Sequence, residues 1–402
     1  MSAAAAIRPA HPTDPSQPAP RSAHFPLFDS LRAIAALSVL LYHVRDYSGV
    51  SATVQRYTGH LDMGVTVFFV ISGFLLYRPF VHARLRGKPP LATGPYAWRR
   101  FLRIVPAYWV ALIAAGLLLG NYTVFGTHSP YYFGLLQTFR SDTMFGGISQ
   151  AWTLSVELSF YVFLPLWAWA IHRVPARTAG GRLDVEIVGI GVLLAIGLLY
   201  QELYLFGPHG SERHGVPWLA LPHFIDQFAI GMGLAVASVW LEGRPLPPAV
   251  RVVARYPSLP WIAAGVAFWV ACTQIGLHGV AWEYQSQGQA LDLHYLASVV
   301  GLGLVLPAVF GDPRVGGVRR LLGYAPLLWV GLVSYAVYIW HPTVLRKLFD
   351  WRWPQDVIHA TGLPPYLVWA VLTLAIVLVV AALSYYAIER RALSLKRFRI
   401  GE

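Results

Sequence analysis

The stretch FDSLRAIAALSVLLYHVRD, residues 28–46, is apolar enough to form a membrane helix, yet it contains an arginine and a histidine. Arg32 and His43 are eleven residues apart, and eleven helical steps of about 100° end within about 20° of the starting direction. Both side chains therefore lie on one face of the predicted helix, about 16 Å apart along its axis. Because a charged side chain inside a membrane is costly, this face is a candidate functional site.

The composition of the whole chain is that of a helical membrane protein. Of the 402 residues, 56% are hydrophobic and only 12% are charged, whereas soluble domains carry roughly 25% charged residues. The apolar stretches are continuous rather than alternating, which disfavours a membrane barrel. We therefore predict an all-α, polytopic integral membrane protein with about ten transmembrane helices. Their predicted ranges are 28–49, 60–80, 101–120, 151–171, 187–206, 220–241, 259–277, 291–310, 321–345 and 365–388.

The distribution of basic residues predicts the orientation of these helices. The net charge is +12, and 24 of the 31 lysine and arginine residues fall on segments that are inside if the N-terminus is inside. Positive charge gathers in cytoplasmic loops, so we predict that both termini are cytoplasmic. A soluble protein of this charge would suggest nucleic acid as a partner. In a membrane protein the charge instead indicates contact with the lipid bilayer and no nucleic acid.

Three parts of the chain follow from these patterns. Residues 1–26 are rich in Ala, Pro and Ser and are expected to form a disordered cytoplasmic tail. Residues 27–390 form the transmembrane domain, and residues 391–402 form a basic cytoplasmic tail. The single cysteine, Cys272, allows no intrachain disulfide. The sequence has no CxxC pair and no HExxH, GxSxG or Walker motif, so we expect no metal site.

Two further arginines lie at the predicted inner end of the third span. In WRRFLRIVPAYW, residues 98–109, Arg100 and Arg103 are three residues apart and so share a helix face. A pair of this kind suits bidentate binding of phosphate groups. The same charges could equally serve only to set the membrane orientation. Both interpretations are kept.

An acid and a group of polar aromatic residues complete the candidate set. Glu157 lies in AWTLSVELSFYVFLPL, residues 151–166, in the same predicted outer half of the membrane as His43. Tyr335, Tyr338 and His341 come from VSYAVYIWHP, residues 333–342, near the outer end of the ninth predicted span. Interfacial tyrosine and tryptophan belts produce such a group without any chemistry, so this set can be purely structural.

Five sequence blocks together resemble the membrane acyltransferase 3 family. That family carries an Arg or Lys, ten residues and a His in its first helix, followed by a second-helix block, an RxxR pair, a Trp-x-Leu-x-x-Glu block and a late Ser-Tyr-x-x-Tyr-x-x-His block. Each block alone would be weak evidence for the family, but here all five occur in the family's order over about residues 26–390. The matching stretches are FDSLRAIAALSVLLYHV, GVTVFFVISGFLLYRPF (64–80), RFLR (100–103), AWTLSVELSFY and SYAVYIWHP.

The chain departs from the family pattern in two respects. The opening usually reads Asp-Gly-Leu-Arg, and here Ser30 stands in place of the Gly. Many members also carry a C-terminal extracytoplasmic SGNH domain, whereas this chain ends shortly after its last predicted span. We therefore expect the stand-alone form, in which the membrane domain itself or a separate partner protein selects the acceptor.

The resemblance implies transfer of an acyl group, often acetyl, from cytoplasmic acyl-CoA to a hydroxyl group. The acceptor would be a surface polysaccharide, a glycolipid or a glycosylated secondary metabolite, and the location a bacterial plasma membrane. Acyl-CoA would be a co-substrate, with no bound cofactor. The alternative is a transporter or flippase, but the sequence shows no two similar halves of the kind that many transporters have.

The resemblance also assigns expected roles to individual residues. His43 would be the general base, because its ordinary pKa is near neutral. Glu157 would be a second catalytic residue that orients or stabilises the imidazole, and Asp46, one turn beyond His43, could assist it. Arg32, Arg100 and Arg103 would bind the phosphates and arm of acyl-CoA. A weaker expectation places further residues at the substrate, namely Asp46, Ser72, Tyr335, Tyr338 and His341.

Overall fold

The computed structural model describes residues 25–205, 216–280, 283 and 285–397, and every regular element within them is helical. The all-α class is therefore confirmed. The predicted N-terminal tail, apart from residues 25 and 26, and residues 398–402 lie outside the described part of the chain. Residues 391–397, which the sequence assigned to the C-terminal tail, are helical.

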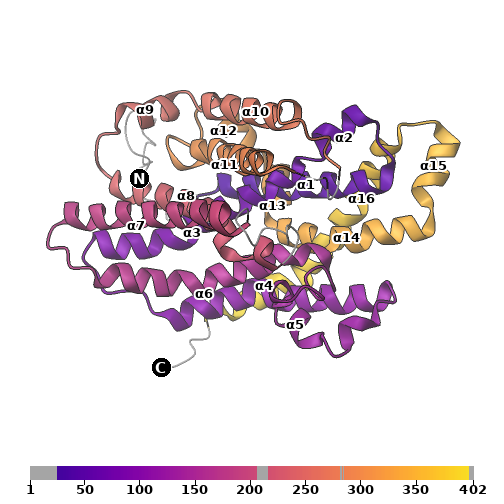
Figure 1. Ribbon diagram of the computed structural model, residues 1–402, viewed down its shortest axis with the longest axis horizontal. Helices are drawn as coiled ribbons and strands as arrows, with labels where there is room; N and C mark the ends of the chain where they lie inside the picture. The colour runs from indigo at the N-terminus through magenta and orange to yellow at the C-terminus, as the bar shows by residue number, and fades with distance from the viewer. Residues whose placement is uncertain (1–24, 206–215, 281–282, 284, 398–402) are drawn as a thin grey trace, which may run out of the picture.

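The helices follow one another with short connections (Figure 1). The α-helices are α1 (Leu27–Ser48), α2 (Ala52–Thr58), α3 (Gly64–Leu85), α4 (Thr93–Leu118), α5 (Ser129–Phe133), α6 (Trp152–Arg173), α7 (Ala179–Leu199), α8 (Leu221–Trp240), α9 (Pro248–Arg255), α10 (Ser258–Thr273), α11 (Gln287–Val309), α12 (Gly317–Leu322), α13 (Ala325–Leu332), α14 (Ser334–Trp351), α15 (Trp353–Thr361), α16 (Pro365–Ser384) and α17 (Arg390–Ser394). Short 3₁₀ and π turns are η1 (Leu61–Met63), η2 (Tyr122–Phe125), η3 (Gln137–Phe139), η4 (Ser149–Ala151), η5 (Tyr200–Leu205), η6 (Val216–Leu219), η7 (Tyr385–Glu389) and η8 (Leu395–Arg397).

Eight of these helical segments are long and apolar enough to cross a membrane, and the bent pair α13–α14 can serve as a ninth. The apolar helix α10, at the seventh predicted span, is shorter, with 16 residues. The prediction of one continuous helix over 321–345 is wrong, because α13 and α14 meet at an angle of 70°. At this break the Ser334 hydroxyl donates to the Gly331 carbonyl at 2.7 Å. A Cβ atom on Gly331 would lie 1.8 Å from the Asp29 carbonyl oxygen, so α13 also packs directly on the start of α1.

Helix α3 packs closely against α8 and also contacts α1, α6, α7 and α11. Glycines allow the close approach of α3 and α8, as is common for membrane helices. A Cβ on Gly73 would lie 2.1 Å from the Phe228 carbonyl oxygen, and one on Gly231 would lie 2.0 Å from the Val70 carbonyl oxygen. The two backbones are therefore in direct contact at these positions.

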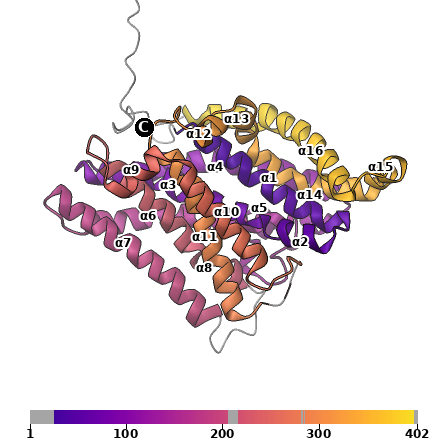
Figure 2. The same ribbon diagram turned by 90° about the horizontal axis from the view of Figure 1, so that it is seen from above.

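Helices α3 and α8, with the helices that contact them, form one layer. A second layer is formed by α1, α14 and α16, which lie side by side in both ribbon views (Figures 1 and 2). Helix α1 belongs to both layers, because Phe28 stacks on Phe74 of α3 at 4.9 Å while Leu40 and Val44 pack with residues of α14 and α16. The chain thus brings segments from its two ends together. This arrangement positions the candidate site.

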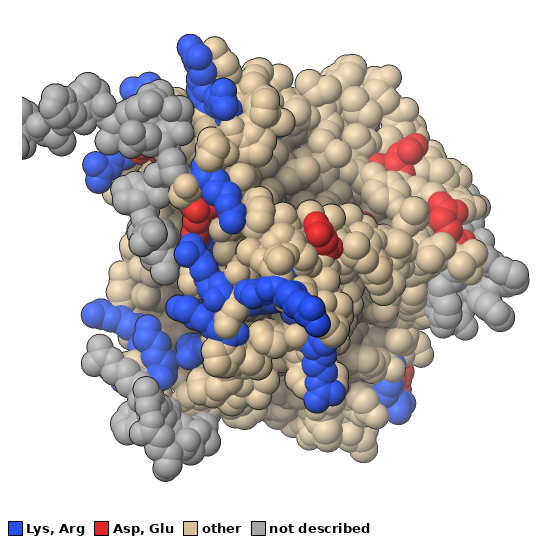
Figure 3. Space-filling model, turned by 90° about the vertical axis from the view of Figure 1, so that its left-hand side faces the viewer, with Lys and Arg blue, Asp and Glu red and all other residues tan. Residues whose placement is uncertain are grey.

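Basic side chains gather on one side of the molecule, the side that carries α9 (Figure 3). Arg251 and Arg255 of α9 belong to the loops that the charge distribution predicts to be inside. On the same predicted side, Arg78 and Arg86 both pair with Glu242. A positively charged side is what the positive-inside rule predicts for the cytoplasmic face. The cytoplasmic location of both termini stays a prediction.

Candidate active site

A cavity of about 250 Å³ opens among α1, α3, α4, α6 and α14. Seven of the ten residues singled out from the sequence line it, although they come from five separate helices. These seven are Arg32, Ser72, Arg100, Arg103, Glu157, Tyr335 and Tyr338. The other three, His43, Asp46 and His341, lie outside its wall. The structure therefore divides the predicted site into a cavity and a separate pair of histidines.

One wall of the cavity is cationic. Arg32 of α1 pairs with Asp29 of its own first turn at 2.8 Å. In contrast, Arg100 and Arg103 of α4 form no ion pair with any carboxylate in the described residues, and the buried Nε atom of Arg100 has no hydrogen-bond partner there. The guanidinium of Arg100 lies over the Tyr161 ring, 5.9 Å from the ring centroid. Arg100 and Arg103 therefore have no direct carboxylate partner in the described residues, although Glu157 lines the same cavity and Glu389 attracts Arg103 at longer range.

Glu157 is the carboxylate of this cavity, and hydroxyl groups hold it in place. The hydroxyls of Ser72 and Tyr161 each donate to its Oε1 atom at 2.7 Å. Tyr161 is not among the residues predicted from the sequence, but its spacing of four residues from Glu157 on α6 places it on the same helix face. Glu157 makes no hydrogen bond to His43. Its expected role in orienting that imidazole therefore has no direct contact to support it.

The two tyrosines of α14 connect the cavity to its surroundings. The Tyr335 hydroxyl donates to the Ile104 carbonyl of α4 at 2.8 Å. The Tyr338 hydroxyl lies 2.7 Å from Thr153 Oγ1 at the start of α6. Both hydroxyls are thus engaged by the protein and fix α14 against α4 and α6.

The histidine pair lies next to this cavity, beyond Tyr338. The ring centroids of Tyr338 and His341 are 5.8 Å apart. The ring centroids of His341 and His43 are 5.1 Å apart. His43 is half-buried and His341 is completely buried. Tyr338 therefore contacts both parts of the predicted site.

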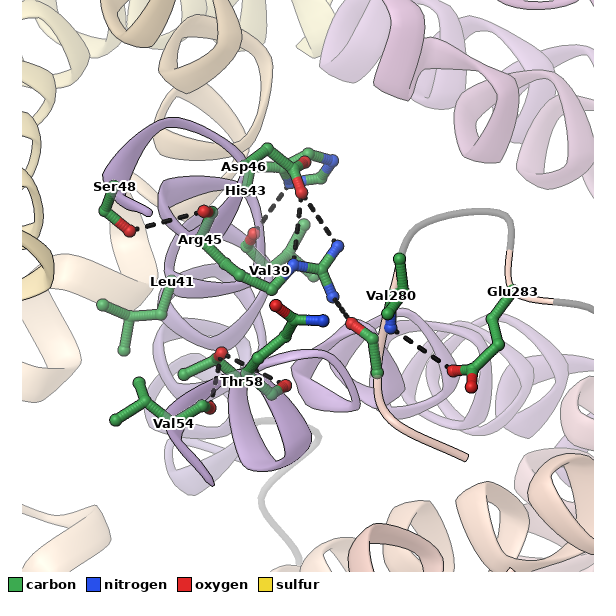
Figure 4. A network of polar contacts seen from close by, with 12 residues as sticks. Val39, Leu41, His43, Arg45, Asp46, Ser48, Val54, Thr58, Val280 and Glu283 are labelled. Carbon is green, nitrogen blue, oxygen red and sulfur yellow. Dashed lines mark hydrogen bonds and ion pairs between the residues drawn. The ribbon is translucent and has the colours of Figure 1, made fainter. Parts of the chain in front are cut away.

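Asp46 lies one turn beyond His43 but is paired elsewhere (Figure 4). Its Oδ1 atom accepts hydrogen bonds from Nε and Nη2 of Arg45, at 3.2 and 2.9 Å. The buried Arg45 also donates through Nη1 to the Gly279 carbonyl at 2.5 Å. Arg45 therefore connects the C-terminal end of α1 to the loop before α11, a contact that the sequence does not reveal.

Within the described ranges, no group of three or more His, Cys, Asp or Glu side chains is arranged to hold a metal ion. The chemical resources of the site are thus a cationic cavity, one hydrogen-bonded carboxylate and an adjacent imidazole pair. This combination can bind an anionic ligand and can accept a proton a short distance away.

The chain is similar in sequence to several bacterial proteins. The chain is 25% identical to the peptidoglycan O-acetyltransferase OatA of Listeria monocytogenes over 383 residues, which are 91% of this chain and 55% of that protein. It is 23% identical to a putative O-acetyltransferase of Staphylococcus aureus strain COL, over 91% of this chain and 57% of that protein. The chain thus spans little more than half the length of these two relatives. It is 26% identical to nodulation protein 10 of Rhizobium leguminosarum bv. viciae, over 93% of this chain and 95% of that protein.

No solved structure matches the chain. The model of a family described as an acyltransferase domain matches residues 26–386, which include every residue of the cavity and both histidines. The predicted family is therefore confirmed. The chain belongs to the membrane acyltransferase 3 family.

Proposed function

We propose that this protein is a membrane O-acyltransferase that moves a short acyl group, such as acetyl, from acyl-CoA to a hydroxyl of a carbohydrate-containing acceptor. The observation that carries the proposal is the pair Arg100 and Arg103, which have no direct ion pair in the described residues. They line a cavity that contacts the His43 pair through Tyr338. An anion site next to a proton acceptor is what transfer from a phosphate-bearing thioester requires.

The donor would lie along the arginine wall. Guanidinium groups bind phosphates through paired, charge-assisted hydrogen bonds, and here two of them have no carboxylate partner in the described residues. The cavity, at about 250 Å³, is smaller than the roughly 300–1,000 Å³ of pockets that hold whole ligands. It therefore suits the narrow acyl-bearing arm of CoA, with the nucleotide at the mouth.

His43 would supply the base. Its free ring nitrogen takes the proton of the acceptor hydroxyl while that oxygen attacks the thioester carbonyl, and the departing CoA sulfur then receives the proton. The surrounding helices exclude water, which limits hydrolysis of the thioester. Glu157, held by Ser72 and Tyr161, would act on the donor side as the single carboxylate of the cationic cavity.

The names of the relatives support the proposed acceptor class. The one named for its substrate acetylates peptidoglycan, which supports a glycan, glycolipid or glycoside as the acceptor here. The acceptor hydroxyl would reach His43 from the predicted outer side of a bacterial plasma membrane. A separate partner protein could present it.

The test is release of free CoA by the purified protein in liposomes. Acetyl-CoA is supplied with peptidoglycan fragments, N-acetylglucosamine oligomers or glycosides, and the thiol is measured. We expect release that depends on one of these hydroxyl acceptors. A transporter or flippase would release no CoA with any of them. In that case acetyl-CoA would also fail to raise the melting temperature of the protein, and the proposal would be rejected.

A further inference from the structure

His341 is a buried titratable group that the proposed reaction does not use. It lies on α14, its side chain is completely buried, and it does not line the cavity. Its Nδ1 atom is 3.2 Å from the Val337 carbonyl oxygen one helical turn earlier. A carbonyl oxygen can only accept, so this nitrogen carries the hydrogen. In the neutral ring the lone pair is then on Nε2.

The same reasoning fixes the hydrogen of His43. Its Nδ1 atom lies 2.8 Å from the Val39 carbonyl oxygen, again one turn earlier on its own helix. His341 Nε2 lies 3.3 Å from the same Nδ1 atom. Two acceptors, a carbonyl oxygen and a ring lone pair, therefore converge on one N–H group. If Nδ1 of His43 carried the lone pair instead, it would face the Val39 oxygen at 2.8 Å without a hydrogen between them.

The geometry points to His341 as a positioning residue that fixes the tautomer and orientation of His43. With its hydrogen held on Nδ1, His43 presents the lone pair on Nε2, which is the atom that receives the proton of the acceptor hydroxyl. This inference rests on the proposed function. The proton passes from the hydroxyl to Nε2 of His43 and then to the CoA sulfur, so His341 neither gains nor loses a proton.

The same contact favours the charged form of the base. When Nε2 of His43 takes the proton, the ring becomes a cation whose Nδ1–H already points at His341 Nε2 and the Val39 carbonyl. Hydrogen bonds strengthen when the donor becomes charged. No group has to move at that moment, because the packing of α14 on α1 already brings His341 to His43.

Two substitutions separate this role from simple packing. His341→Leu fills the space but removes the acceptor, whereas His341→Gln can place an amide oxygen where Nε2 stands. Loss of one hydrogen bond to a charged group corresponds to a factor of about 10–150. We therefore expect the kcat of His341→Leu to fall about 10–150-fold, with the KM for acetyl-CoA within about twofold. His341→Gln should recover most of the lost kcat.

The matched control is Thr343→Val on the same helix, a buried residue outside the site, which should keep wild-type kinetics. Wild-type kcat in His341→Leu, or an equal loss of kcat in the Leu and Gln variants, would overturn the inference. If the Leu variant does not fold, the ¹⁵N spectrum of histidine-labelled wild-type protein reads the tautomer directly. A neutral His43 with its hydrogen on Nε2 would also overturn it. An active His43→Ala variant would instead reject the proposed base itself.

Discussion

Replacing Arg100 by alanine gives the sharpest expectation for the donor site. Arg100 has no ion pair in the described residues, and its buried Nε has no hydrogen-bond partner there. Its removal therefore leaves no carboxylate without a partner, so the cost to folding should be small. The main effect should fall on an anionic ligand of the cavity.

The magnitude follows from the contacts that Arg100 is free to make. A hydrogen bond to a charged group contributes about 1.5–3 kcal/mol, which corresponds to a KM for acyl-CoA that is about 10–150-fold higher. Arg100→Lys should restore only part of the affinity, because lysine lacks the planar, two-pronged donor. The value of kcat should change less, since the phosphates are remote from the thioester, although remote binding can also contribute to kcat.

The assay is the KM for acetyl-CoA in purified protein, measured by release of free thiol at two salt concentrations. Arg99→Ala is the matched control, since Arg99 is the adjacent residue, is exposed and does not line the cavity. High salt should weaken donor binding in wild type more than in Arg100→Ala. If both variants lower the amount of inserted protein equally and the KM stays at the wild-type value, these arginines only set the orientation and the donor site is refuted.

Three further results are expected. Glu157→Gln should lower kcat about tenfold, because two hydroxyls donate to a charged oxygen of Glu157. The effects of Glu157→Gln and His341→Leu on the activation free energy should be additive, since the two groups are not in contact. Strong non-additivity of the two effects on kcat would contradict this separation. A single cysteine placed at Lys88 should react only with reagents that reach the cytoplasmic side. Labelling by a reagent that stays outside would contradict the predicted orientation. Gly231→Ala should lower the melting temperature, because its Cβ would lie 2.0 Å from the Val70 carbonyl oxygen and overpacking costs about 1–3 kcal/mol or more; an unchanged melting temperature would show that α3 and α8 can separate freely.

Helical periodicity and charge predict much of the cavity lining before any coordinates are known. The three-residue spacing of Arg100 and Arg103 places both on one wall, and the cost of charge in a membrane singles out Arg32 and Glu157, which line the same cavity. These predictions of position agree with the cavity lining because they concern one helix at a time. Spacing along a helix converts directly into direction and distance.

Contacts between distant helices are not predictable in this way. His43 and His341 are 298 residues apart, and their contact depends on how α1 packs against α14. Sequence position suggested Glu157 or Asp46 as the neighbour of the imidazole, but Glu157 is held by Ser72 and Asp46 is paired with Arg45. The break between α13 and α14 is likewise set by tertiary contact, since Gly331 packs on the α1 backbone.

The most direct test of the whole account is the acceptor-dependent turnover of His43→Ala. His359→Ala, an exposed histidine on α15, serves as the control. Loss of a general base usually lowers the rate about 10²–10⁴-fold. We expect a fall of this size in His43→Ala, with acetyl-CoA binding and membrane insertion preserved and with the control at the wild-type rate. A His43→Ala protein that keeps more than a few per cent of the wild-type turnover would contradict the account.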